Sequence, residues 1–160
     1  MAASCRFAFA IHIMAVLAYE DRQREQGLTS EAIARSVNTN PVVIRRILCD
    51  LKKAGLVATH KGASGGTRLA REPQSISLDA VYRAIHGGPS FSAHPQQPDQ
   101  RCPVGRKIEL VLEEVFASAE QALQHALAQR TLADVLEDVT SAEGRGDSVQ
   151  GASARPNVLS

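Results

Sequence analysis

The chain has few cysteines and no apolar run long enough to cross a bilayer. Its three cysteines, Cys5, Cys49 and Cys102, are odd in number and far apart, so they indicate no disulfide framework and are typical of the reducing cytoplasm. The apolar stretch from Phe7 to Tyr19 is shorter than the roughly 20 residues that span a membrane. We therefore expect a cytoplasmic protein whose first helix is buried.

Signatures of catalysis and of nucleotide binding are also missing. No Ser-His-Asp, HExxH or paired-carboxylate arrangement stands out, which argues against an enzyme. The glycine-rich stretch from Thr59 to Ala70, THKGASGGTRLA, does not fit a phosphate-binding P-loop, because no lysine follows Gly66 and no helix is expected after it. We expect a two-stranded hairpin with a glycine tip instead.

Net charge is small, at +1 for 160 residues, yet the charges are unevenly distributed along the chain. Eight lysines and arginines but only one acid lie between Arg35 and Arg71, whereas nine acids and three bases lie between Lys107 and Asp147. A basic front and an acidic back predict that one face binds a polyanion. With 44% apolar residues, the chain suits one compact domain with accessory segments.

Capping residues predict two helices joined by a short turn. Thr29 and Ser30 supply side-chain oxygens that cap a helix ending near Val37. Asn40 is expected to cap a second helix, which starts at Pro41 and runs to residue 54. Three turn residues separate the two helices, and this is the outline of a helix-turn-helix.

The second of these helices has a buried stripe and an exposed basic side. The stripe recurs at helical spacing and consists of Ile44, Ile47, Leu48 and Leu51. The opposite side presents Val42, Arg46, Cys49 and Lys53, with Arg45 beside them. Because the arginines lie close to the N-terminus of the helix, we interpret residues 41–54 as a recognition helix that reads base edges.

The glycine-rich hairpin follows directly, over residues 57–70. Its two short arms, LVATH and TRLA, flank the glycines, and Lys61 and Arg68 stand at its shoulders. This is the layout of a wing, whose cations neutralise phosphates. We therefore predict a mainly α fold with a small β-hairpin wing, in which residues 1–86 form a winged helix-turn-helix domain closed by a short helix that Ser77 caps.

The C-terminal part is expected to form a linker and a long dimerisation helix. Residues 87–103 are rich in glycine and proline, as in a linker loop. Apolar residues then recur at spacings of three and four and predict one amphipathic helix, which has no partner within a small domain and so predicts a homodimer seam. Its seam residues are Ile108, Val111, Leu112, Val115, Ala119 and Ala122. A short terminal helix completes the segment 104–140, and residues 141–160 are expected to be a disordered tail.

Four segments, SVNTNPVVIRRILCDLKKAGLV, GASGGTRLA, LDAVYRAI and CPVGRKIELVLEEV, occur in this order and together resemble the Rrf2 family of bacterial winged-helix transcription regulators. The resemblance covers about residues 4–139. It implies a homodimer that reads a palindromic operator, usually to repress, with the long C-terminal helices crossing between subunits.

Carried over by position, the resemblance implies a set of DNA-contacting residues. The turn and recognition helix supply Asn38, Thr39, Asn40, Val42, Arg45 and Arg46; the wing supplies Lys61, Ser64, Gly65 and Arg68; the N-terminal segment supplies Ser4 and Arg6. Three positions depart from the family pattern, because Ala63 and Ser64 stand where many relatives have proline and glycine, and Thr67 stands where they have an aromatic residue.

The linker differs from that of family members with an iron-sulfur cluster. Those members place three cysteines there, because a cluster needs several thiolate ligands, whereas here the segment holds only Cys102, with His94 before it. We therefore expect no iron-sulfur cluster and no other metal or cofactor. Cys49 and Cys102 lie beside several cations, which favour the thiolate that oxidants attack, so both are candidate redox-sensing residues. A small-molecule effector is the alternative signal.

Two functions fit these patterns. The leading hypothesis is a homodimeric repressor that binds double-stranded DNA. The alternative is a winged-helix module that binds a protein partner or an effector without specific DNA binding. Salt-sensitive binding to duplex DNA separates the two.

Overall fold

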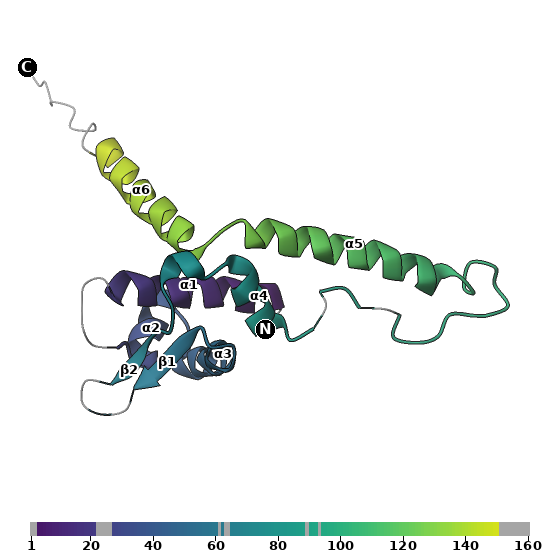
Figure 1. The fold of residues 1–160 in the computed structure, drawn as a ribbon, viewed down its shortest axis with the longest axis horizontal. Coiled ribbons are helices and arrows are strands. Elements are labelled where there is room, and N and C mark those ends of the chain that lie inside the picture. Colours follow the sequence, from purple (N-terminus) through teal and green to yellow (C-terminus); the bar gives the residue numbers. More distant parts are fainter. Residues whose placement is uncertain are drawn as a thin grey trace, which may run out of the picture.

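A computed structural model of the chain describes residues 3–21, 27–60, 62, 65–88, 90–92 and 94–150. In chain order the elements are α1 (Ala3–Asp21), α2 (Ser30–Val37), α3 (Pro41–Lys53), β1 (Val57–His60), β2 (Gly66–Leu69), the 3-10 helix η1 (Pro73–Ser75), α4 (Leu78–His86), α5 (Ile108–Ala128) and α6 (Leu132–Gln150). Figure 1 shows the elements from α1 to α4 gathered in one body, from which α5 and α6 extend in different directions. The predicted mainly α fold with a small hairpin is confirmed.

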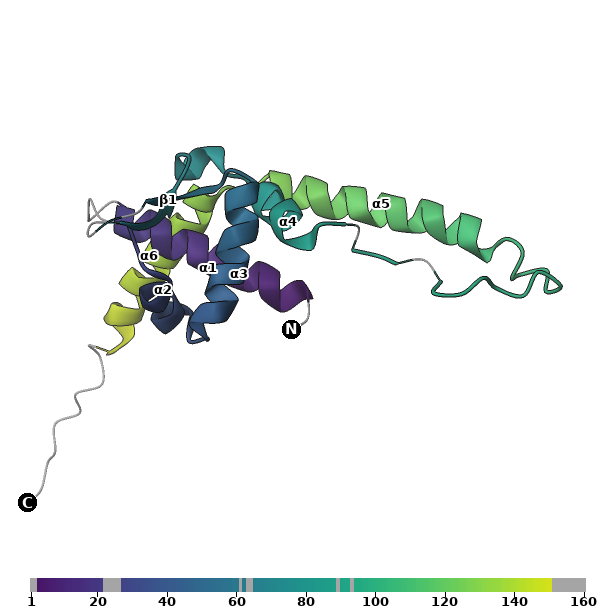
Figure 2. The ribbon, with the colours of Figure 1, turned by 90° about the horizontal axis from the view of Figure 1, so that it is seen from below.

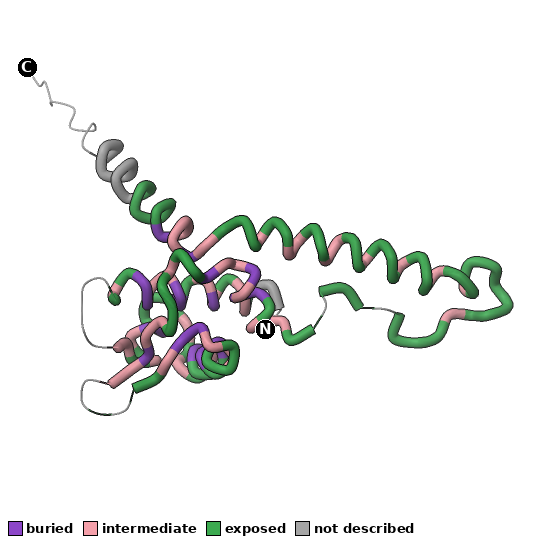
Figure 3. Tube along the Cα trace, in the orientation of Figure 1, coloured by how far each residue is buried: buried purple, intermediate pink, exposed green. Residues whose placement is uncertain are grey.

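The core of this body surrounds α1, as expected of a buried first helix. Its residues with almost no exposed surface lie at helical spacing and are Ala10, Ile13, Met14, Leu17 and Ala18. They pack against buried side chains of α2, α3 and α4, each of which contacts α1. Figure 3 shows the buried positions concentrated in this part of the molecule. Because burial of each large aliphatic side chain contributes about 1.5–3 kcal/mol, the shared core holds the helices together.

The helix-turn-helix forms where its capping residues predict it. The Thr29 hydroxyl accepts a hydrogen bond from the amide of Ala32 in α2. At the start of α3, the carboxamide oxygen of Asn40 accepts one from the amide of Val42 at 2.8 Å. Between the helices, Asn38 has a φ of 55°, a left-handed conformation that asparagine tolerates. These local interactions fix where α3 begins.

The predicted wing is confirmed as an antiparallel pair of strands. β1 and β2 pair from Val57 opposite Leu69 to His60 opposite Gly66. The hairpin follows α3 directly and leads through η1 to α4, which closes the domain. Figure 2, a view from below, shows the same body with α5 leaving it on one side and α6 on the other.

The wing is also joined to the segment before α2, a contact that the sequence did not predict. Leu28 and Thr67 form an isolated bridge, in which the Thr67 amide donates to the Leu28 carbonyl at 2.8 Å and the Leu28 amide donates back at 3.0 Å. Beside this bridge, Gly66 has a φ of 142°, and a Cβ there would clash with the carbonyl of Gly27. Glycine at this position therefore serves a close backbone contact inside the fold.

α5 lies apart from the core. It begins at Ile108 rather than at Val104, because turns occupy residues 101–107. Not one of its side chains is buried, although the helix contacts α4, where Arg83 donates a hydrogen bond to Gln124 at 3.4 Å. In Figures 1 and 2 the linker leaves α4, runs alongside α5 and then reverses direction to join the start of α5.

α6 returns the chain to the domain. Leu132 and Leu136 are buried in its core, and the Leu132 amide donates a hydrogen bond to the Ile76 carbonyl at 2.8 Å. In the opposite direction, the Leu78 amide at the start of α4 donates to the Arg130 carbonyl, also at 2.8 Å. The linker and α5 are therefore held at both ends by the winged helix-turn-helix domain.

The sequence prediction placed the end of α6 too early. The helix continues to Gln150, whereas we expected a short helix within 104–140 and a disordered tail over 141–160. Residues 141–150 contain no proline, so nothing in them blocks the backbone hydrogen bonds of a helix. The rest of the expected tail, 151–160, lies outside the described residues.

Candidate nucleic-acid interface

One side of α3 forms an exposed, basic surface, which we call the α3 basic face. Its exposed side chains are Val42, Arg45, Arg46, Cys49, Lys52 and Lys53. The opposite side is the buried stripe that the sequence predicted, formed by Ile44, Ile47, Leu48 and Leu51. Four cations on one face of a 13-residue helix make a surface suited to a polyanion.

The turn before α3 contributes further polar groups. Asn38 and Asn40 are exposed, whereas Thr39 is half-buried. The oxygen of the Asn40 side chain accepts the capping hydrogen bond of α3, which leaves the nitrogen and the second lone pair of the oxygen to contact a ligand.

Arg45 is held against α2. Its Nη2 atom lies 2.7 Å from Oε1 of Glu31, and its Nε atom donates to the Ser30 hydroxyl at 3.2 Å. The hydrogen bond from Arg45 lowers the pKa of Glu31 from its usual value, so this carboxylate stays charged at neutral pH. Both side chains are more than half exposed, so water screens the pair and a phosphate can compete for Arg45.

Arg46 differs from Arg45 because no hydrogen bond or ion pair engages it within the described part of the chain. It borders a shallow hollow of about 450 Å³, together with Arg6, Val43 and Cys49. Its guanidinium is therefore exposed and available for contacts outside the fold.

The acid in α3 is neutralised by two cations. Asp50 pairs with Arg6 of α1 at 2.7 Å and with Lys53 at 3.7 Å. Arg6, which the family resemblance implies as a phosphate contact, is thus already partnered, with 34% of its side chain exposed. Ser4, the other N-terminal candidate, lies in α1, but its side chain is outside the described part.

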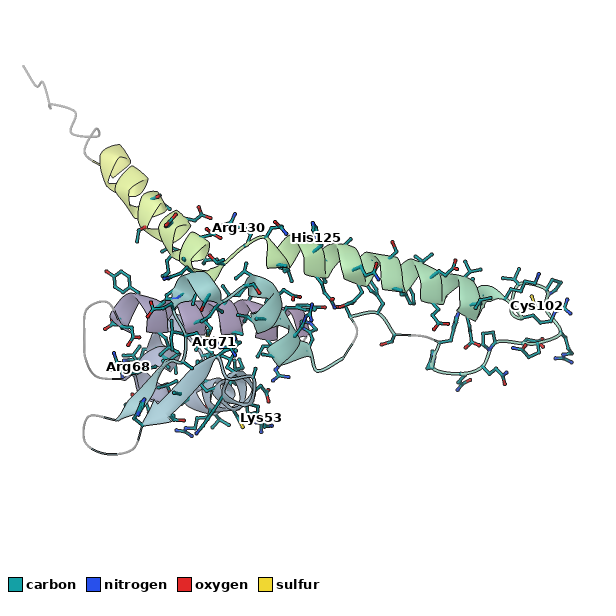
Figure 4. The ribbon with its side chains drawn as sticks, viewed as in Figure 1. Lys53, Arg68, Arg71, Cys102, His125 and Arg130 are labelled. Carbon is teal, nitrogen blue, oxygen red and sulfur yellow. The ribbon has the colours of Figure 1, made fainter. Side chains whose placement is uncertain are left out.

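The wing residues have different surroundings from those expected. Arg68 of β2 points back to α1, where its Nε atom lies 2.7 Å from Oδ1 of Asp21, and Figure 4 shows it on that side of the sheet. Gly65 precedes β2, and its amide donates to the Gly62 carbonyl at 3.0 Å. Lys61 and Ser64 lie outside the described residues. The prediction that these four contact DNA stays a prediction.

A groove between α3 and the wing contains two residues that the sequence prediction did not assign to DNA contact. Lys52 and Thr59 are exposed, and both line a hollow of about 440 Å³ that Cys49 also borders. The sequence could not assign Thr59 to the interface, because only the tertiary fold brings this residue close to α3. It could have assigned Lys52, which is a cation one helical turn from Cys49 on the predicted recognition helix.

The cysteines are separated in space. Cys49 lies on the α3 basic face, whereas Figure 4 shows Cys102 at the far end of the linker, well away from Lys53 at the end of α3. Hydrogen bonds from the backbone amides of Gly105 and Val104 lower the pKa of the Cys102 thiol. Its thiol is exposed and accessible.

The expected absence of an iron-sulfur cluster stays a prediction. A cluster needs several thiolates close together, and no three His, Cys, Asp or Glu side chains in the described ranges are arranged to bind a metal ion. Cys5 and Cys49 lie on α1 and α3, so neither accompanies Cys102 in the linker.

The expected dimer seam on α5 is accessible. Val111 and Val115 are 52% and 54% exposed. Ala122 is exposed too, whereas Ile108, Leu112 and Ala119 are half-buried. In the part of the chain that the structure describes, no helix is long and apolar enough to span a bilayer.

Comparison with known proteins agrees with this geometry. The Rrf2 family, described as iron-dependent transcriptional regulators, matches residues 3–138. YwnA of Bacillus subtilis strain 168, which is named as an HTH-type transcriptional regulator, is 40% identical over 131 residues, covering 82% of this chain and 94% of YwnA. The HTH-type transcriptional regulator NsrR of Geobacillus kaustophilus strain HTA426 is 31% identical over 140 residues, covering 83% of this chain and 88% of NsrR.

Solved structures give the same assignment. IscR of T. potens is 26% identical, with a TM-score of 0.64 over 86% of this chain and 87% of IscR. A crystal structure described as that of a DNA-binding protein is 39% identical, also with a TM-score of 0.64, over 82% of this chain and 98% of that one. The family consists of transcriptional regulators and not of enzymes. From the match over residues 3–138 and from these relatives, we conclude that the chain belongs to the Rrf2 family of winged-helix transcriptional regulators.

Proposed function

We propose that the protein is a homodimeric repressor that reads a palindromic operator in double-stranded DNA through α3 and the wing. The observation that carries this proposal is the α3 basic face, in which the Arg46 guanidinium has no partner within the described residues. An arginine in this state contacts DNA without first losing an ion pair. Its planar fork matches the two acceptors of guanine in the major groove.

The other residues of the interface are proposed to position the protein on the phosphate backbone. Lys52 and Lys53 are exposed point charges near the C-terminal end of α3. Asn38 and Thr39 lie in the turn before α3, and Gly65 directly precedes β2 of the wing. Contacts of this kind supply affinity that falls with salt, whereas base contacts supply specificity.

Three cations that the family resemblance implies as DNA contacts have acidic partners. Arg6, Arg45 and Arg68 pair with Asp50, Glu31 and Asp21 respectively. We propose that each shares or exchanges its carboxylate for a phosphate when DNA binds. Ser4, Lys61 and Ser64 keep their proposed roles as phosphate or minor-groove contacts.

Dimerisation is proposed to occur through α5. The support is a 21-residue helix without a buried side chain, on which Val111 and Val115 are more than half exposed. Two copies of such a helix bury these side chains against each other around a twofold axis. A twofold-symmetric protein with one recognition helix per subunit matches an operator with two inverted half-sites.

We propose that the signal is an oxidant acting on Cys49 or Cys102 in the cytoplasm, without an iron-sulfur cluster. Cys49 lies on the α3 basic face, so a bulky or anionic oxidation product there opposes DNA binding. Cys102 is supported by its exposed thiol and by the two amides that stabilise its thiolate.

Selection of bound sequences from a pool of random duplexes tests the proposed function. We expect the full chain to enrich an inverted repeat and to bind it more tightly than a scrambled duplex of the same composition. Affinity for both duplexes should fall as salt is raised. If no sequence is enriched and binding does not respond to salt, the proposal is wrong and the alternative module without specific DNA binding is supported.

A further inference from the structure

A cavity of about 530 Å³ lies between the linker and α5. Pockets for small molecules have volumes of about 300–1,000 Å³, so the size suits an organic ligand. Phe91 and His94 of the linker form one wall, and one side of α5 forms the other. The linker lies alongside α5 in both ribbon views (Figures 1 and 2).

This cavity lies largely on a different side of α5 from the proposed dimer seam, and the two share only Leu112 among the described lining residues. Successive residues of an α-helix are about 100° apart, so Val111, Val115 and Ala119 share one side of α5. The cavity residues Glu113 and Phe116 lie about 120° further round the helix. The cavity therefore stays on the side that faces the linker of its own chain when α5 pairs along the seam.

Two phenylalanine rings provide an aromatic wall. Phe91 and Phe116 are stacked, with ring centroids 5.3 Å apart and planes inclined by 16°. Phe91 is 41% exposed, and both rings line the cavity. The negative potential of an aromatic face attracts cations.

Acidic groups surround the same space. Glu109, Glu113 and Glu120 line the cavity, and its described lining contains neither lysine nor arginine. Glu120 is held in place by the Ser90 amide, which donates to it at 3.0 Å, and by Gln124, which donates at 3.2 Å. The hydrogen bond from Ser90 lowers the pKa of Glu120, so its carboxylate is charged at neutral pH.

We propose that this cavity binds a lipophilic organic cation, such as a quaternary ammonium or phosphonium ion. The glutamates neutralise the charge of the ligand, the rings of Phe91 and Phe116 contact its apolar groups, and Leu112 extends the apolar lining. A bare metal ion is a poor match, because no three ligating side chains in the described ranges are arranged to hold one. An organic anion is opposed by the carboxylates.

The cavity is connected to the DNA-binding domain through α4. Glu120 lies near Tyr82, a buried residue of α4, and burial together with the charge of Glu120 raises the pKa of the Tyr82 hydroxyl. Tyr82 in turn stacks on His86 at 4.0 Å and meets the edge of Phe7 in α1 at 5.3 Å. A cation that engages Glu120 thus acts on the contact between α5 and the body that carries α3. This regulatory step rests on the proposed function, whereas cation binding does not.

Two ions of the same shape and opposite charge test binding directly. Calorimetric titration of the full chain without DNA compares tetraphenylphosphonium with tetraphenylborate. We expect the cation to bind and the anion to bind at least about tenfold more weakly, because the carboxylates repel it. Equal affinity for the two ions, or no binding of the cation, overturns the proposal.

Neighbouring glutamates on α5 provide a matched pair of variants. Glu113 lines the cavity, whereas Glu114 is exposed on another side of the helix. We expect Glu113→Gln to weaken tetraphenylphosphonium binding about fivefold or more, and Glu114→Gln to leave it within about twofold. Phe116→Leu keeps an apolar side chain but loses the ring, and it should also weaken binding. Equal effects of the two glutamate variants contradict the assignment to this cavity.

Duplex binding with and without tetraphenylphosphonium separates the two proposals. We expect the cation to change the affinity of the full chain for its selected duplex, and Glu113→Gln to reduce that change. If the chain binds the cation but no duplex, the proposed function fails and the cation site stands. If the chain binds the duplex but not the cation, the proposed cation site fails and the proposed function stands.

Discussion

Glu31 of α2 and Arg45 of α3 form an ion pair across the helix-turn-helix, with 2.7 Å between Oε1 and Nη2. The pair lies on the surface that we propose meets DNA, so it places a negative charge where phosphates must approach. It also holds an arginine that the family resemblance implies as a DNA contact. In the proposed complex, Arg45 therefore shares its carboxylate partner with a phosphate or exchanges the one for the other.

Glu31→Gln should strengthen DNA binding and make it more sensitive to salt. Without the carboxylate, Arg45 is free to contact a phosphate, so we expect affinity to rise about threefold and the salt slope to grow by about one unit. Fluorescence anisotropy of a labelled duplex over a range of salt concentrations measures both. The same substitution in an Arg45→Ala background is the control, since an equal gain there would show that Arg45 is not involved.

Arg46→Ala should weaken specific binding more than non-specific binding. A bidentate arginine–guanine contact is worth about 1–3 kcal/mol of discrimination, so the ratio of the two affinities should fall by about tenfold or more. Lys52→Ala is the comparison, because a phosphate contact supports all sequences alike. An unchanged ratio in Arg46→Ala would mean that another residue reads the bases.

Val111→Glu combined with Val115→Glu should convert the dimer into a monomer. A carboxylate in an apolar seam loses its hydration, so the dimer dissociation constant should rise at least about 100-fold. Sedimentation velocity measures the change. Leu110→Glu is the matched control, because Leu110 is 69% exposed but points to another side of α5.

A chain truncated near residue 101 is a less informative test of dimerisation. Truncation also removes Leu132 and Leu136, which are buried in the core of the winged helix-turn-helix domain. A monomer obtained in that way reports on lost stability as well as on a lost seam, whereas the valine substitutions leave α6 in place.

Asp134→Asn should lower stability at neutral pH and flatten its dependence on pH in acid. The Thr131 amide and hydroxyl donate to Asp134 at 2.7 and 2.9 Å, and chiefly the amide lowers the pKa of Asp134 below its usual 3.8. A carboxyl whose pKa is lowered by folding stabilises above its unfolded pKa and loses that effect as pH falls through the folded value. Thermal melts between about pH 2 and 6 should therefore converge for the two proteins at the acid end. A constant difference in Tm over this range would contradict the stabilising effect of the hydrogen bonds from Thr131 to the Asp134 carboxylate.

Cys102 should react with iodoacetamide at lower pH than an ordinary thiol. Backbone amides lower the pKa of Cys102 from its usual 9.0, so the pH midpoint of the alkylation rate should lie below that value. Mass spectrometry of peptides assigns the rate to each cysteine. A midpoint at or above 9.0 for the Cys102 peptide would contradict this prediction.

Peroxide treatment tests whether either cysteine controls DNA binding. We expect oxidation to release the native chain from its duplex, and Cys49→Ser or Cys102→Ser to abolish that release. Dithiothreitol should restore binding if the product is a disulfide or sulfenic acid. Equal binding of all three chains after treatment would exclude thiol sensing.

The helix-turn-helix was predictable because its signals are local. Thr29 and Asn40 accept hydrogen bonds from amides within one helical turn, and Pro41 suits the first position of a helix. The hairpin requires only two short strands and a glycine-rich tip. The family resemblance added the expected DNA contacts to this local evidence.

Contacts between distant segments were not predictable in the same way. Arg68 and Asp21 are 47 positions apart, and nothing in the neighbourhood of either residue indicates the other. The bridge between Leu28 and Thr67 and the burial of Leu132 likewise depend on how the finished elements pack. Such contacts determine which cations of the proposed interface form ion pairs in the absence of DNA.

The double attachment of α5 has a consequence for operator spacing. The linker and α5 leave the domain after α4 and are tied back to it by backbone hydrogen bonds between α6 and Ile76 and between α4 and Arg130. A dimer joined through two such helices holds its two recognition helices at a fixed separation and a fixed angle. Domains that are joined to a dimer interface by flexible linkers are not constrained in this way. One base pair added between the half-sites shifts the second half-site by about 3.4 Å and turns it by about 35° around the DNA axis. Such a frame cannot follow that rotation without strain, so we expect the proposed dimer to bind an operator and its one-base-pair insertion with different affinities.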